Sequence, residues 1–227
     1  MHNENTYTSD NNDIETLANE IREAIAQGAH VQQTVQRLTL NAMNAQHINL
    51  ESLQRIITAV MQGVHDGAEQ KFQHVTNQTQ AAKMQIAEAV AGLDSALARF
   101  AEASKLAIEE AAGQARKYSD TDLNRTRSDL ESLEKLFLDT LHHTATTAQG
   151  LVSDILHDLS HHAQNNGTTV GAQIKDALAT IAQQIASVGY AQLETSSSLA
   201  HATADFIGKL ASGVLAGINE QVKNNKH

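Results

Sequence analysis

Apolar and small residues recur at steps of three and four along most of the chain, which is the spacing of one face of an α-helix. The first such stretch predicts a helix over residues 13–46. We call its apolar face the first seam, and it consists of Ile14, Leu17, Ile21, Ala24, Gly28, Val31, Val35, Leu38, Ala42 and Ala45.

A second helix is predicted over residues 50–118, with Asn49 as its N-cap because a short polar side chain there accepts a bond from the first turn. Three successive steps of four, from Val60 to Phe72, shift the apolar register by about one residue. The stretch GVHDG lies in the middle of this shift and contains two glycines. We therefore predict a kink near residues 63–67, and the sequence leaves open whether the helix continues or folds back there.

Two more helices are predicted over residues 120–164 and 168–222, separated by the turn NNG at Asn165–Gly167. Residues 1–12 and 223–227 lack this periodicity and are predicted to be disordered tails, which leaves a single domain over residues 13–222. The predicted fold class is all-α, with long amphipathic antiparallel helices that form an elongated helical bundle with coiled-coil-like hairpins.

The composition supports long helices and excludes several kinds of functional site. The chain of 227 residues contains no proline, the residue that interrupts helices, and 35 alanines, the best helix formers. It contains no cysteine, which excludes disulfides, a thiol nucleophile and thiolate metal sites. No strand precedes a serine as a nucleophile elbow requires, and no glycine-rich phosphate loop is present. The sequence thus predicts a protein that is not an enzyme and needs no cofactor.

The charge balance bears on partners and location. A net charge of −10 without a basic stripe argues against nucleic acid, because such binding depends on cations that displace counterions from phosphates. Residues 1–13 do not resemble a signal peptide, so we expect a cytoplasmic protein. The glycine pair Gly213 and Gly217 lies within an amphipathic stretch, Phe206–Val222, that we expect to pack in the bundle. A membrane or lipid surface is the less favoured partner for that stretch.

Histidine is the residue type that stands out, with 12 copies. Asp154, His157 and His161 are spaced so that they share one face of a helix, where they could jointly bind Zn or Ni. Placing Ile155 at the centre of the apolar face puts these three side chains on the opposite, solvent-exposed side. This geometry favours a plain polar face over a metal site on the surface, and it opposes a catalytic metal centre in the core. Whether the histidine-rich helix binds metal or senses pH stays open.

Several stretches resemble an uncharacterised proteobacterial family of Ala-rich, all-helical proteins of unknown function. They are LDSALARFAEASKLAIEEAAGQARKYSD, DLESLEKLFLDTL, GTTVGAQI and ASGVLAGI. The resemblance extends from about Leu38 to the C-terminus and implies no activity. The composition is also similar to that of phasins, the helical coats of bacterial polyester granules, although no phasin motif matches residue by residue.

These observations predict a non-enzymatic helical scaffold or interaction protein that self-associates through its apolar seams. The expected partner is a second copy of the chain, in a homo-oligomer, together with a protein partner that the sequence does not identify. The alternatives are an amphitropic, phasin-like protein that coats a lipid or polyester surface and, less favoured, a protein that binds metal on its surface.

Overall fold

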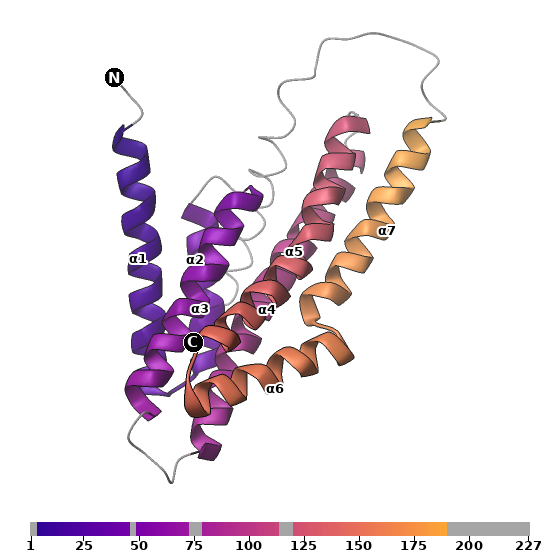
Figure 1. Ribbon diagram of the computed structural model, residues 1–227. Coiled ribbons are helices and arrows are strands. Elements are labelled where there is room, and N and C mark those ends of the chain that lie inside the picture. The colour runs from indigo at the N-terminus through magenta and orange to yellow at the C-terminus, as the bar shows by residue number, and fades with distance from the viewer. Residues whose placement is uncertain (1–3, 46–48, 73–78, 114–119, 190–227) are drawn as a thin grey trace, which may run out of the picture. The chain divides into compact units, whose positions relative to one another are not determined.

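The structure is a computed structural model that describes residues 4–45, 49–72, 79–113 and 120–189 (Figure 1). The described residues form seven helices and no strand, which confirms the all-α prediction and the packing of helices into a bundle. The helices are α1 (Glu4–Gln27), α2 (Val31–Ala45), α3 (Leu50–Phe72), α4 (Thr79–Gly113), α5 (Asp120–Thr147), α6 (Gly150–Asn166) and α7 (Thr169–Gly189).

The chain divides into two compact units, whereas the sequence predicted a single bundle. Unit 1 consists of residues Met1–Ala96 and Lys135–Thr168, and unit 2 consists of Leu97–Glu134 and Thr169–His227. Helices α4 and α5 each contribute one part to each unit. The predicted tail over residues 1–12 also differs from the structure, because α1 begins at Glu4.

The predicted continuous helix over residues 13–46 is wrong, because the chain reverses between α1 and α2 (Figure 1). Gly28 adopts φ 71° and His30 adopts φ 52°, the left-handed conformation that ends helices. The Gly28 amide donates a hydrogen bond to the Ala24 carbonyl at 3.0 Å. The Lys71 ammonium of α3 donates to the Ile25 carbonyl at 3.0 Å, which satisfies one of the unpaired carbonyls at the end of α1. The first seam therefore folds back on itself at Gly28.

The chain does not fold back near residues 63–67, the question that the sequence left open, because α3 runs as one helix from Leu50 to Phe72. Its two glycines serve close packing against α1. A methyl group at Gly63 would lie 2.4 Å from the Ala18 carbonyl oxygen, and one at Gly67 would lie 2.8 Å from Ile25 Cβ. The register shift that suggested a kink thus coincides with a close contact between α1 and α3.

The predicted start of α3 is confirmed in detail. Asn49 Oδ1 accepts a hydrogen bond from the Ser52 amide at 2.8 Å, and Ser52 Oγ accepts one from the Asn49 amide at 2.9 Å. This reciprocal arrangement is a capping box with serine at the third position. The connection from α3 to α4, residues 73–78, lies outside the described residues.

The predicted helix over residues 120–164 is divided into α5 and α6, which form a corner within unit 1. Gly150 begins α6 with φ 56°, a conformation that costs glycine little. Ser153 Oγ donates a hydrogen bond to the Ala145 carbonyl at 2.8 Å and so joins α6 to the end of α5. The predicted turn after α6 is confirmed, since Gly167 has φ 82° and its amide donates to the Ala163 carbonyl.

In unit 2, polar contacts join α7 to the second part of α4. Lys105 Nζ on α4 forms an ion pair with Asp176 Oδ2 on α7 at 2.5 Å. The hydroxyl of Thr180, which is 9% exposed, lies 3.5 Å from Glu109 Oε1. The apolar side of α7 presents Val170, Ile174, Ala177 and Ile181, all of them buried. The predicted continuation to residue 222, the stretch Phe206–Val222 with Gly213 and Gly217, and the tail at 223–227 lie outside the described residues.

Candidate functional site

A groove between α1 and α2 brings together the two ends of the first seam. It has a volume of about 250 Å³ and is lined by Asp13, Thr16, Leu17, Glu20, Arg37, Leu38, Asn41, Ala42 and Ala45. Leu17 and Leu38, which are 4% and 8% exposed, form an apolar floor, and Ala45 lies exposed at one end. The reversal at Gly28 creates this groove, because it places residues far apart along the seam next to each other.

The rim of the α1–α2 groove carries charges of both signs. Asp13 and Glu20 come from α1, Arg37 comes from α2, and all three side chains are exposed. Small-molecule pockets usually have volumes of roughly 300–1,000 Å³, so this groove is somewhat small for a drug-sized ligand. An apolar floor between charged edges instead suits a few side chains from a partner helix.

Exposed large apolar side chains are rare in the part of the chain that the structure describes. Two are found there, Met84 at 54% and Leu106 at 40% exposure, both on α4. Met84 belongs to unit 1, as does the α1–α2 groove, whereas Leu106 belongs to unit 2. The exposed Glu88 follows Met84 by four positions and therefore shares its side of the helix.

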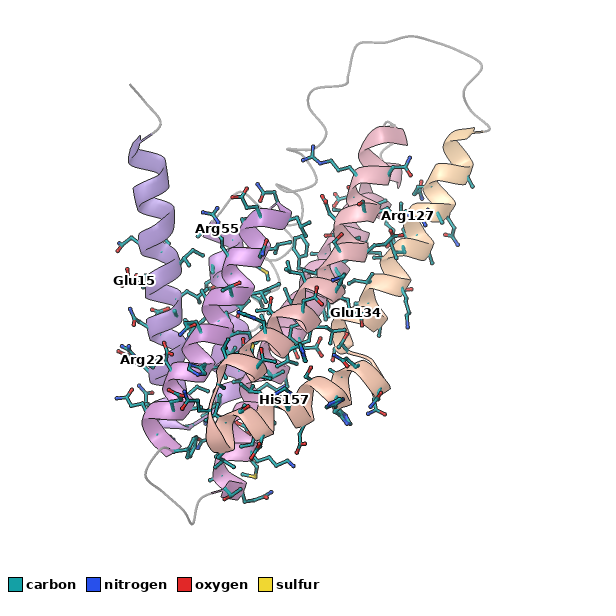
Figure 2. The ribbon with its side chains drawn as sticks, viewed as in Figure 1. Glu15, Arg22, Arg55, Arg127, Glu134 and His157 are labelled. Carbon is teal, nitrogen blue, oxygen red and sulfur yellow. The ribbon has the colours of Figure 1, made fainter. Side chains whose placement is uncertain are left out.

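The three predicted metal ligands lie on α6, but the structure does not place them in one cluster. Asp154 and His161 are exposed, as the helical wheel predicted. His157, labelled on α6 in Figure 2, is instead half-buried. Its ring meets that of His142 on α5 edge to face, with 5.9 Å between ring centroids and 76° between ring planes. Among residues with described placement, no group of three or more His, Cys, Asp or Glu side chains is arranged to hold a metal ion.

The pairing of His142 with His157 is absent from the sequence prediction. That prediction treated residues 120–164 as a single straight helix, in which two residues fifteen positions apart would lie about four turns from each other. The corner at Gly150 brings them together. A glycine between two apolar seams is compatible with a helix end, but the sequence does not distinguish Gly150 from a glycine inside a helix such as Gly63.

Several charged and polar groups near the α5–α6 corner have partners of their own. Lys83 on α4 lies 3.4 Å from Asp158 on α6, and Lys135 pairs with Asp139 along α5. The Nδ2 atom of Asn166 lies 3.0 Å from His162 Nδ1. The corner therefore combines two facing imidazoles with two aspartates, Asp139 and Asp158, that pair with lysines.

The chain belongs to DUF6781, a family of unknown function, whose model matches residues 7–224. This finding agrees with the resemblance to an uncharacterised family. No curated protein and no solved structure matches the chain. In the described part of the chain, none of the helices has both the length and the apolarity needed to cross a bilayer.

Proposed function

We propose that this protein is a non-enzymatic helical interaction protein that self-associates, and that its relatives are Ala-rich helical proteins of proteobacteria. The observation that supports this proposal is the α1–α2 groove. Most described residues of the first seam are buried by the chain's own helices, so association uses the part of the seam that stays open. That part lies in the groove, at Ala42 and Ala45 beside Leu17 and Leu38.

A second copy of the chain supplies an occupant that fits the groove. Met84 presents an exposed, unbranched apolar side chain, the type that adapts to irregular surfaces. Packing Met84 onto the floor formed by Leu17 and Leu38 removes its apolar surface from water, which is favourable by about 25 cal/mol per Å². Glu88, one turn further along α4, then meets the basic rim residue Arg37. Reciprocal insertion gives a two-fold dimer.

Sedimentation velocity over a wide range of protein concentrations tests this proposal. Because a contact of this kind buries a small area, we expect weak, reversible association. Ala45→Glu, at an exposed position in the groove, and Met84→Glu should each shift the protein toward the monomer. Leu106→Glu is the matched control, since it adds the same charge at the other exposed apolar residue of α4, and it should associate as the wild type does.

A charge reversal provides a more specific check. Arg37→Glu should weaken association by placing like charges together, and Glu88→Lys in the same chain should restore it. Monomeric wild-type protein at all concentrations would overturn the proposal. Loss of association in Leu106→Glu alone would assign the contact to unit 2. Flotation of the protein with neutral vesicles, abolished by Met84→Glu, would support the lipid-coating alternative in its place.

A further inference from the structure

The α5–α6 corner holds two imidazoles in an arrangement that suits one metal ion. The ring centroids of His142 and His157 lie 5.9 Å apart. Two imidazoles that bind a single Zn²⁺ through bonds of about 2.0–2.1 Å place their ring centres roughly 5–6.5 Å apart, depending on the angle at the metal. The observed centroid distance falls within this range, so the two rings are close enough for one nitrogen of each to bind the same ion.

We propose that His142 and His157 form a two-histidine site for a divalent transition metal ion, with Zn²⁺ as the representative ion. Neutral imidazole is a common ligand of Zn, Ni and Cu, and the absence of cysteine leaves histidine as the chain's strongest donor for these ions. The remaining coordination positions are open to water, because His142 is exposed and His157 is half-buried.

The corner holds the two ligands in place before the ion arrives. The Ser153–Ala145 hydrogen bond joins the two helices between the histidines. Leu141 precedes His142 and Leu156 precedes His157, and both leucines are fully buried. The backbone that carries each histidine is therefore anchored, so binding costs little conformational entropy.

The charged groups around the site are compatible with a bound cation. Asp154 lies one turn before His157 on α6, and His161 lies one turn after it, so both are on the same side of the helix. Lys83 faces Asp158, and Lys135 faces Asp139, so these two lysines are engaged by carboxylates. An ion bound by ligands from both helices would hold the corner closed, and so stabilise the fold of unit 1.

Calorimetric titration of the full-length, chelator-treated protein with zinc chloride at neutral pH tests this site. The wild type should bind one Zn²⁺ per chain with a melting temperature that rises on binding. His142→Gln and His157→Gln should each lower the zinc affinity at least tenfold. Each should also abolish the rise in melting temperature on zinc addition. His143→Gln and His162→Gln are matched controls on the same two helices, and they should bind as the wild type does.

Other results would overturn the proposal. Unchanged zinc affinity in His142→Gln would show that this ring is not a ligand. Loss of binding in His161→Gln and His157→Gln but not in His142→Gln would assign the ion to the face of α6 alone. Circular dichroism of each variant at room temperature establishes that it is folded. Since the readouts are zinc affinity and melting temperature, the outcome does not depend on whether the protein self-associates.

Discussion

Gly63 on α3 lies directly against the main chain of Ala18 on α1, so closely that a methyl group at Gly63 would lie 2.4 Å from the Ala18 carbonyl oxygen. Real Cβ atoms do not approach an oxygen so closely, and a backbone carbonyl is unable to move aside as the end of a side chain would. The contact between these two residues therefore requires glycine and fixes the distance between the two helices.

The first prediction is that Gly63→Ala destabilises the protein. In an exposed helix interior the same change would stabilise by about 1 kcal/mol, because alanine is the better helix former. Here the added methyl group overpacks the α1–α3 contact, and we expect a loss of about 1–3 kcal/mol. Urea unfolding measures the difference. Gln54→Ala, at an exposed position of α3, is the control and should be neutral or slightly stabilising, and a stabilised Gly63→Ala variant would contradict the close packing.

A second prediction concerns the turn between α1 and α2. Gly28→Ala should destabilise by about 1–2 kcal/mol, because an alanine at φ 71° brings Cβ close to a carbonyl oxygen. His30→Gly should have the opposite sign, with a gain of up to about 1 kcal/mol, since His30 holds φ 52° without being a glycine. Thermal unfolding of both variants tests the pair, and equal effects in the same direction would be inconsistent with a left-handed turn at these positions.

The third prediction is that Asp129→Asn stabilises the protein at neutral pH. Burial raises the pKa of Asp129 above its ordinary value of 3.8, and nearby Arg125 opposes this shift only in part. The folded state therefore holds the proton more tightly than the unfolded state does. Stability from this group is present at low pH and is lost as pH rises through the raised pKa. Denaturant unfolding should show the advantage of Asp129→Asn at pH 7 and its disappearance as pH approaches 3.8, and a constant difference across that range would refute the assignment.

The fourth prediction concerns the ion pair between Lys105 and Asp176. The hydrogen bond to Asp176 raises the pKa of Lys105, although partial desolvation opposes the effect. Any stability from this raised pKa is present below 10.5, the ordinary value, and is lost as pH rises through the folded pKa. A double-mutant cycle with Lys105→Met and Asp176→Asn should give a favourable coupling at low salt that shrinks at high salt, because exposed pairs are screened. Coupling that does not respond to salt would show that the pair is not electrostatic in origin.

The sequence was sufficient for features that depend on local chemistry. The Asn49 cap and the Gly167 turn follow from residue types that satisfy helix ends wherever they occur. The all-α fold follows from periodicity alone, and the solvent exposure of Asp154 and His161 follows from their place on the helical wheel.

Features that depend on contacts between helices were beyond the sequence. Gly28, Gly63 and Gly150 look alike in the sequence, yet the first and third end or begin helices, whereas Gly63 lies inside one. A glycine that admits a neighbouring helix is distinguished from one that reverses the chain only by what packs against it. The α1–α2 groove arises from the reversal at Gly28 and the His142–His157 pair from the corner at Gly150, so neither was predicted.

Cross-linking between copies shows whether the α1–α2 groove of one chain receives Met84 of another. The chain has no cysteine, so single cysteines can be introduced at will. Chains carrying Ala45→Cys are mixed with differently tagged chains carrying Met84→Cys, at a concentration where the wild type associates, and treated with a short bismaleimide. Mixed 45–84 dimers should form faster than 45–45 or 84–84 dimers, and faster than 45–106 dimers made with Leu106→Cys. Equal yields for all pairs, or no dimers at all, would contradict this contact.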